Sequence, residues 1–436
     1  MNDQFNVLSS DKWMLHSLPL ETALKGRFYD VLPVNIHFSP ALDCNYSCPH
    51  CTYGDSKIDF ENRLGSENEL KKEQVHTQLE TMKIVFDRME EAGLKRLIFS
   101  GGGEPLMNPD TIAGMAYATE IGLDVGLFTN GSLLSISRID KILETNPSVI
   151  RISLNAGTEE SHRLFHGLEY PHFQRVINNI RYLTTEKQRR KLSVEVSIAV
   201  IVTPLNFDTI LDMSDILSDI EGINYLNIRP TINYANHTKM INRGVDEGTQ
   251  YVVENHPNYA NDYKAFFTSG EQFSQDFFDE VIGLANIAKE RLKGKITVNI
   301  PEHKFEALTE VEPSLKECLA SPWALGVGPD GLVYVCVEHN MAAEYCIGDL
   351  KTQSFSEILN SPKRWAVIDK INEKQDINSI CGPGCMLSDL NKVLIGVKDS
   401  SEVEKDVIRK NAYNYRKEVR ALIKAGKLSS DFTNII

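Results

Sequence analysis

Basic residues are scarce in this 436-residue chain: 46 Lys and Arg stand against 60 Asp and Glu, for a formal net charge of −14. Binding to nucleic-acid phosphates requires a positively charged surface, so this balance argues against a nucleic-acid partner. A negative charge fits a neutral or cationic substrate, although acidity is also common among ordinary soluble proteins.

Long apolar runs are also missing. No stretch approaches the roughly 18 apolar residues that a membrane-spanning helix needs, and Met1 to Leu18 lack a basic region followed by an apolar core. The 42% of hydrophobic residues nevertheless suffices for large cores and two domains. We therefore expect no membrane partner and a cytoplasmic location.

Cysteine is absent between Cys51 and Cys318, and the eight cysteines fall into two groups on either side of that gap. Four disulfides are conceivable by number alone. The short spacings inside each group are typical of metal or cluster ligands, which fits a reducing compartment better.

The first group is Cys44, Cys48 and Cys51, which follow a strand-like run at Val34–Phe38. Three thiolates at this spacing can hold three corners of a cubic iron–sulfur cluster and leave the fourth iron open for chemistry. A structural zinc site is the alternative, because Cys-x-x-Cys pairs often bind zinc. Zinc would need a fourth ligand, and His50 lies too close to Cys51 along the backbone to complete a relaxed tetrahedron.

Short apolar runs alternate with amphipathic segments through the first half of the chain, which predicts βα units and a parallel sheet. The predicted strands are Val34–Phe38, Arg96–Phe99, Val125–Phe128, Val149–Leu154, Val194–Val202 and Tyr225–Ile228. The predicted helices between them lie near Lys71–Ala92, Asp110–Ile121, Ile136–Glu144, Phe173–Thr184 and Phe207–Asp219. Small or polar residues follow each strand, at the edge where barrel enzymes place their sites.

A glycine-rich stretch, Ser100-Gly101-Gly102-Gly103-Glu104-Pro105, follows the second predicted strand. Glycine lets the backbone approach a ligand closely. The stretch lacks the Lys-Ser/Thr of a Walker loop and is not the GxGxxG of a dinucleotide fold. Glycines beside proline also mark plain turns.

The three cysteines and the glycine-rich stretch, one βα unit apart, resemble the motifs of radical S-adenosylmethionine (SAM) enzymes. The resemblance implies an α/β fold with a partial (β/α)6 TIM-type barrel, and a [4Fe–4S] cluster on Cys44, Cys48 and Cys51 whose open iron binds SAM. An external one-electron reductant of the flavodoxin or ferredoxin type would allow reductive cleavage of SAM to a 5′-deoxyadenosyl radical. His50 stands where that family often has an aromatic residue.

The same resemblance assigns further SAM contacts. Gly102, Gly103, Glu104 and Pro105 match the GGEP motif residue by residue, and its backbone groups meet the SAM amino group. Ser153 and Asn155 fall where the family contacts the SAM ribose or carboxylate, and Val200 or Ile201 where it contacts adenine. Capping of the following turn is the alternative role for Ser153 and Asn155.

The second cysteine group surrounds a predicted β-hairpin that runs from Trp323 to Cys336 and turns at Pro329-Asp330-Gly331. It resembles the SPASM and twitch extensions of radical SAM proteins. The full SPASM pattern has more cysteines and two clusters, so this chain is similar to the shorter form with a second, auxiliary [4Fe–4S] cluster. The implied ligands are Cys318, Cys336, Cys381 and Cys385. Structural zinc suits four thiolates too.

Cys346 is then left over. Spare cysteines are mostly buried packing residues; the sharper hypothesis makes the Cys346 thiol a catalytic hydrogen-atom donor to a substrate radical, as an epimerase requires. Glu338 and His339 are acid–base candidates by position only.

The predicted organisation is a cover segment at 1–33, the core barrel at 34–230, a lid and connection with a helix at 231–304, a smaller α+β cluster-binding domain at 305–392 and a helical tail at 393–436 packed on it. The stretch before Cys44 is too short for the peptide-recognition domain that often precedes such barrels. We therefore expect hydrogen abstraction from a small molecule, such as a sugar, aminocyclitol or antibiotic intermediate, that leads to dehydrogenation or epimerisation. The alternatives are modification of a peptide or protein, and a non-catalytic zinc-binding protein.

Overall fold

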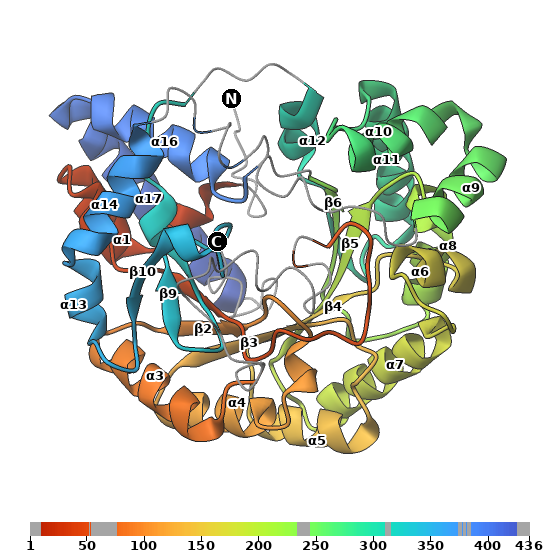
Figure 1. Ribbon diagram of the computed structural model, residues 1–436, viewed down its shortest axis with the longest axis horizontal. Helices are drawn as coiled ribbons and strands as arrows, with labels where there is room; N and C mark the ends of the chain where they lie inside the picture. The colour runs from red at the N-terminus through yellow and green to blue at the C-terminus, as the bar shows by residue number, and fades with distance from the viewer. Residues whose placement is uncertain are drawn as a thin grey trace.

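A computed structural model describes residues 10–51, 53, 76–232, 245–309, 315–373, 377, 381 and 385–424. In this part of the chain all strands join one curved sheet with helices on its outer face (Figure 1). The strands are β1 (Asn35–Phe38), β2 (Arg96–Phe99), β3 (Asp124–Thr129), β4 (Val149–Ser153), β5 (Glu195–Val202), β6 (Tyr225–Pro230), β7 (Thr297–Asn299), β8 (Ala324–Val327), β9 (Leu332–Tyr334) and β10 (Cys346–Asp349).

The sheet order is β10-β9-β8-β1-β2-β3-β4-β5-β6-β7. Neighbouring strands from β1 to β7 are parallel, as the alternation of apolar runs and helices predicts. The predicted fold class, a partial TIM-type barrel with a smaller C-terminal domain, is confirmed by this arrangement. β7 extends the predicted six parallel strands by one.

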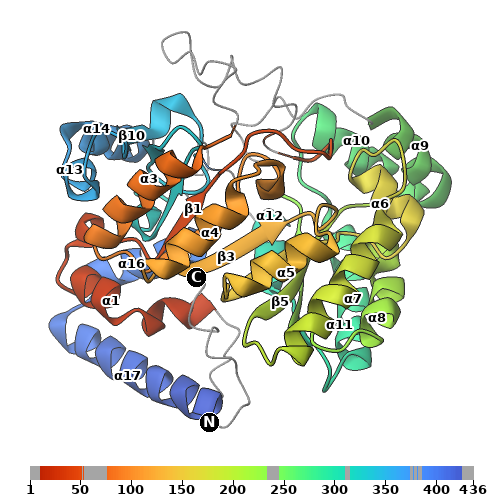
Figure 2. The ribbon, with the colours of Figure 1, turned by 90° about the horizontal axis from the view of Figure 1, so that it is seen from below.

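The α-helices lie on the outside of the curved sheet and at its ends (Figures 1 and 2). They are α1 (Ser17–Leu24), α3 (Leu79–Glu91), α4 (Thr111–Glu120), α5 (Ile136–Glu144), α6 (Glu159–Phe165), α7 (Phe173–Arg189), α8 (Ile210–Ser218), α9 (Val245–Asn255), α10 (Ala260–Thr268), α11 (Gln275–Arg291), α12 (Glu302–Thr309), α13 (Phe355–Leu359), α14 (Pro362–Asn372), α16 (Ser388–Asp399) and α17 (Glu402–Lys424).

Aromatic packing fixes β1 in the core. The ring of Phe38 lies edge-to-face against Phe86 of α3, with centroids 5.1 Å apart, and against Phe99 of β2 at 5.6 Å. All three side chains are fully buried, and such pairs add to the free energy gained by burial alone. The loop that begins after β1 therefore starts from a rigid strand.

The predicted hairpin forms: β8 and β9 are antiparallel, with Gly326 opposite Tyr334. Its first strand also pairs in parallel with β1, from Asn35 opposite Ala324 to Phe38 opposite Val327. The C-terminal domain thus continues the sheet of the barrel. The loop after β8 opens at the same edge as the loops after β1 and β2.

Two predicted regions differ from the structure. The lid and connection predicted at 231–304 were expected to contain one helix, but α9 and α10 also form there, at 245–255 and 260–268. Residues 233–244 lie outside the described ones. The buried side chains of Tyr263, Phe266 and Phe267 form the inner face of α10. This apolar pattern is too short to predict a helix from the sequence, especially so close to His256-Pro257.

The tail was expected to pack on the cluster-binding domain. Its helix α17 instead packs on the N-terminal segment, where buried Tyr415 contacts Met14 and Leu15. The Arg416 Nη1 donates a hydrogen bond to the Met14 carbonyl oxygen at 2.7 Å. Figure 2 shows α17 lying along that side of the molecule.

Among the described residues, no helix combines the length and the apolar character that crossing a membrane would require.

Candidate active site

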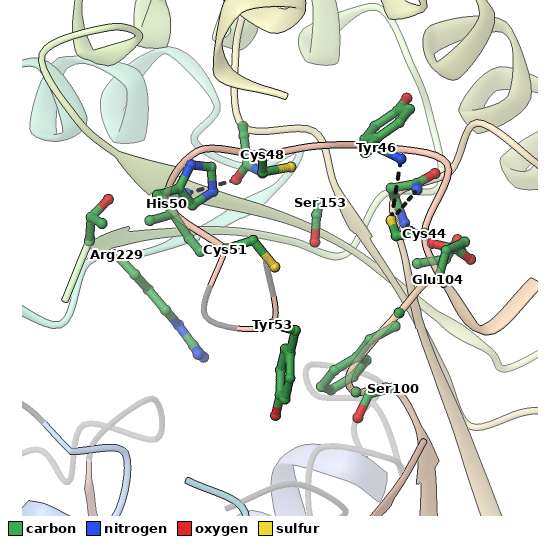
Figure 3. A pocket seen from close by; sticks show the side chains of 18 of the residues that line it. Cys44, Tyr46, Cys48, His50, Cys51, Tyr53, Ser100, Glu104, Ser153 and Arg229 are labelled. Atoms are coloured by element: carbon green, nitrogen blue, oxygen red, sulfur yellow. Dashed lines mark hydrogen bonds between the residues drawn. The ribbon is translucent and has the colours of Figure 1, made fainter. Parts of the chain in front are cut away.

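A pocket of about 490 Å³ opens at the carboxyl edge of the parallel strands. Residues at the carboxyl ends of β3 to β6 and in the loops after β1, β2, β3, β4 and β6 line it, together with residues of α12 and of the C-terminal domain. Figure 3 shows the cysteine loop arching along one side of the pocket, with Arg229 and Tyr53 on the other. The structure thus places both the first cysteine group and the glycine-rich stretch at one cavity.

The three thiols of the first group share one space in this pocket. Cys44 is exposed there, and Cys48 and Cys51 are half-buried. Burial raises the pKa of the Cys48 thiol, and the neighbouring Cys51 and Cys44 raise it further. Neighbouring thiolates repel each other, so each thiol makes the others harder to deprotonate. A bound, positively charged iron centre offsets this repulsion and stabilises the thiolates. The residues present therefore fit the cluster that the spacing predicts.

The glycine-rich loop is fastened to the cysteine loop. The Glu104 N–H donates a hydrogen bond to the Asp43 carbonyl oxygen at 2.9 Å. A Cβ on Gly103 would stand 2.1 Å from that same oxygen, so only glycine permits this approach. Asp43 directly precedes Cys44, and the two predicted motifs therefore hold each other in position.

The Glu104 carboxylate braces a third loop. It is 3% exposed and accepts hydrogen bonds from the Thr129 hydroxyl at 2.7 Å and the Asn130 N–H at 2.8 Å. Asn130 Nδ2 in turn donates to Asn45 Oδ1 at 2.9 Å. Burial raises the pKa of Glu104, while these donors favour its charged form. A network of this kind locks the loops that surround the triad.

A histidine contacts one sulfur of the triad. His166 Nδ1 lies 3.1 Å from Cys48 Sγ, and burial holds the pKa of this imidazole well below its usual value. An iron-bound thiolate can only accept a hydrogen bond, so this contact requires the single proton of the neutral ring on Nδ1, in competition with the Leu154 carbonyl oxygen, which lies 3.4 Å from Nε2. The ring packs on Tyr46, 4.8 Å away between centroids, and on His162 at 4.5 Å.

The four thiols of the second group also interact. Burial raises the pKa of Cys336, and the thiols of Cys385 and Cys318 raise it further. A hydrogen bond with Cys385, together with burial, holds the pKa of Cys381 above its ordinary value. A bound iron–sulfur cluster would relieve this repulsion among four buried thiols, so the residues fit it. No three ligand-type side chains in the described ranges are grouped as a single metal ion requires.

The remaining predicted SAM contacts divide between pocket and core. His50, Gly103, Glu104, Pro105, Ser153 and Asn155 line the pocket. Asn155, at a φ of 60°, accepts a hydrogen bond on Oδ1 from the Ile201 N–H at 2.9 Å. Ile201 lines the pocket, whereas Val200 is buried behind it with 1% exposure. Gly102 also lies behind, and its N–H donates to Ser39 Oγ at 3.3 Å.

Cys346 lies outside the pocket. Its side chain is 3% exposed and packs with Leu42, Tyr334 and Met341. Lys363 Nζ donates to its sulfur at 3.4 Å. This environment agrees with the packing role and does not bring the thiol to a substrate in the pocket.

Several pocket residues had no motif to reveal them. His166 is 118 positions from Cys48, and only the local concentration of His162, His166 and His172 hinted at a site. Lys304 lies on α12 and Met386 lies in a loop, and no motif in either segment marks them as pocket residues. Glu338, named by position alone, lines the pocket, and His339 Nε2 lies 3.5 Å from Cys381 Sγ.

Comparison with known families agrees with this geometry. The model described as radical SAM superfamily matches residues 38–217, and the SPASM model, described as an iron–sulfur cluster-binding domain, matches residues 318–386. These matches imply a [4Fe–4S] cluster with SAM in the first region and auxiliary iron–sulfur binding in the second. They favour iron–sulfur clusters over zinc at both cysteine groups.

Curated relatives carry several different activities. The chain is 26% identical to dTDP-4-amino-4,6-dideoxy-D-glucose ammonia-lyase of Streptomyces venezuelae over 50% of this chain and 44% of that protein. It is 23% identical to AdoMet-dependent heme synthase of Methanosarcina barkeri over 78% of this chain and 84% of that protein. The chain thus spans less than half the length of the first relative.

Among solved structures, SuiB of Streptococcus suis bound to S-adenosylmethionine is similar, with a TM-score of 0.55 and 12% identity. The match covers 81% of this chain and 73% of SuiB. At this identity the likeness concerns the fold alone.

Gly103→Ala should abolish SAM cleavage, because the new methyl group would collide with the Asp43 carbonyl and displace the Cys44 loop. We expect at least a 100-fold loss, in line with about 2.7 kcal/mol or more of lost positioning. 5′-Deoxyadenosine formation by the anaerobically reconstituted enzyme measures it. Gly283→Ala is the control, since nothing lies within 4 Å of its Cβ position. Equal activity of the two variants would contradict the fastening of the two loops.

His166→Leu should lower the midpoint potential of the cluster on the triad. An N–H donor to a cysteine sulfur stabilises the more negative, reduced cluster, and loss of about 1 kcal/mol corresponds to a decrease on the order of 50 mV. EPR-monitored redox titration reads this out without substrate. His256→Leu serves as control, because that ring packs on Phe207. A potential unchanged in His166→Leu would mean that no such bond forms.

Proposed function

We propose that this chain, which belongs to the radical SAM superfamily, abstracts a hydrogen atom from a small-molecule substrate such as a sugar, an aminocyclitol or an antibiotic intermediate. One observation carries the proposal. The same pocket is lined by Cys44, Cys48 and Cys51 and by Val337, Glu338 and Met386, which adjoin Cys336 and Cys385 of the second group.

When bound, the cluster and SAM supply the 5′-deoxyadenosyl radical that takes the hydrogen atom. The protein itself holds these cofactors in place and shields the reacting atoms. The three thiols would ligate the cluster, and Gly103 brings the glycine-rich loop against Asp43. Glu104 fixes the loops at Thr129 and Asn130. The walls of the pocket exclude water and competing reactions from the reacting atoms.

The second thiol group supports dehydrogenation as the outcome. Cys318, Cys336, Cys381 and Cys385 would hold one auxiliary [4Fe–4S] cluster, which would supply a one-electron acceptor. The Met386 N–H donates to Glu338 Oε1 at 2.8 Å, which ties the two pocket-lining segments of this domain together. Epimerisation would need a hydrogen donor at the pocket, and Cys346 is buried elsewhere.

Pocket size supports a small molecule. A volume of about 490 Å³ lies in the usual range of roughly 300–1,000 Å³ for small-molecule sites, part of which SAM would fill. Modification of a peptide or protein is the second candidate, since a related fold, SuiB, has been solved with its precursor peptide. The names of curated relatives, a sugar-nucleotide lyase and a heme synthase, fall on the small-molecule side.

We further propose a cytoplasmic enzyme that receives its electron from a flavodoxin or ferredoxin. All eight cysteines are free thiols, as a reducing compartment and cluster ligation both require.

The test is SAM cleavage by the reconstituted enzyme with dithionite under anaerobic conditions. We expect 5′-deoxyadenosine to form, and to be stimulated by the low-molecular-weight fraction of a cell extract more than by its peptide fraction. Cys51→Ala should form none. Stimulation by the peptide fraction alone would overturn the small-molecule proposal, and cleavage by Cys51→Ala would overturn the role of the triad.

Cys346→Ala separates the two outcomes of the reaction. The variant should lose about 1 to 2 kcal/mol of unfolding free energy, because the Cys346 sulfur fills a buried site beside Leu42 and Met341. Its substrate product and its 5′-deoxyadenosine should match the wild type. Loss of an epimerised product while 5′-deoxyadenosine still forms would instead establish the thiol as the hydrogen donor.

A further inference from the structure

Two cationic side chains line the pocket of this acidic protein, together with the carboxylates of Glu104 and Glu338. The chain carries a formal charge of −14, yet Arg229 at the end of β6 and Lys304 on α12 both line the pocket. Arg151 of β4 lies close behind the wall, with its guanidinium 4.0 Å from the ring centroid of Phe128, another lining residue.

These cations lie near enough to repel one another. Burial lowers the pKa of Lys304, and the charge of Arg229 lowers it further. The same two causes bring the pKa of Arg151 down to about 9. An anion bound between two like charges in a partly desolvated space stabilises both of them.

Asp389, the Cys385 thiol and Glu338 act in the opposite direction and raise the pKa of Lys304, and both carboxylates also have other partners. Asp389 Oδ2 lies 2.8 Å from His303 Nε2, and Glu338 Oε1 accepts the hydrogen bond from the Met386 N–H at 2.8 Å. Both therefore offset the Lys304 charge only in part. An anionic ligand in the pocket would meet two long cationic side chains that approach it from different elements.

Arg229 enters the pocket on a different side from Cys44 (Figure 3). Figure 3 shows Arg229 reaching into the pocket on the side of Tyr53, away from Cys44 and Glu104. By the resemblance to radical SAM enzymes, the amino and carboxylate groups of SAM sit at the iron above the triad. The Arg229 side chain therefore lies away from Cys44, and Lys304 of α12 contributes a second cation to the same pocket.

We propose that Arg229 and Lys304 bind an anionic group of the substrate, a phosphate or a carboxylate, so that the substrate is a small anionic molecule. This inference rests on the proposed function for the identity of the pocket. It reverses the expectation, drawn from net charge, of a neutral or cationic substrate. Arginine and lysine are the side chains that recognise such groups through charge-assisted hydrogen bonds.

Isothermal titration calorimetry tests the proposal with the reconstituted holoenzyme, saturated with SAM and kept oxidised so that SAM stays intact. Inorganic phosphate and acetate are titrated separately, which distinguishes the two kinds of anion. At least one should bind saturably at one site. Lys304→Met and Arg229→Gln should each weaken that binding by about tenfold or more. Lys289→Met, an exposed lysine on α11, should change it less than twofold.

Three results would overturn the proposal: no saturable binding of either anion to the wild type, wild-type affinity in both pocket variants, or weaker SAM binding with unchanged anion binding. The last would assign the cations to the SAM carboxylate. 5′-Deoxyadenosine formation by the wild type is measured on the same preparation. If no 5′-deoxyadenosine forms, the proposed function is refuted. The titration still shows whether the pocket binds an anion, because that measurement does not depend on SAM cleavage.

Discussion

The pairing of β1 on both of its edges is the constraint on which the site depends. β1 binds β2 on one side and β8 on the other, in parallel on both. Strands that run in parallel end at the same edge, so the loops after β1, β2 and β8 open side by side. The first two loops carry Cys44 to Cys51 and Gly101 to Pro105. The hairpin that β8 begins returns through antiparallel β9 to Cys336, where the Val337 N–H donates to the Ala324 carbonyl oxygen of β8. A single strand thereby brings together two cysteine groups that are more than 260 residues apart in the sequence.

Local contacts then hold the loops at this edge of the sheet in fixed positions relative to one another. The approach of Gly103 to the Asp43 carbonyl and the hydrogen bonds of Glu104 join three successive loops into one unit. Ser39 adds a link to the C-terminal domain, because its Oγ accepts from both Gly102 N and Asn340 Nδ2. Burial and neighbouring thiols raise the pKa of Cys48 and of Cys336, which makes these thiols costly to ionise. Binding of iron supplies the missing positive charge, so assembly of the clusters and order of the loops reinforce each other.

The sequence predicted those features whose residues lie close together along the chain. The spacing of the first cysteines, the glycine-rich stretch and the hairpin at Pro329 to Gly331 each lie within a few residues, and the parallel strands follow from their apolar runs. Contacts between distant segments were not visible. Nothing in the residues of Ala324–Val327 indicates a pairing with β1, and nothing near His166 indicates Cys48. Val200 and Ile201 were alternatives for the adenine contact. Ile201 lines the pocket and Val200 is buried behind it, because adjacent residues of a strand point to opposite faces.

The central claim is that two iron–sulfur clusters flank one pocket, and the content of iron and sulfide per chain tests it most directly. After anaerobic reconstitution the wild type should contain about eight irons with matching sulfide, and a variant with Cys44, Cys48 and Cys51 all replaced by alanine about four. About four irons in the wild type and none in the variant would contradict the account, because the cysteines of the C-terminal domain would then hold no cluster.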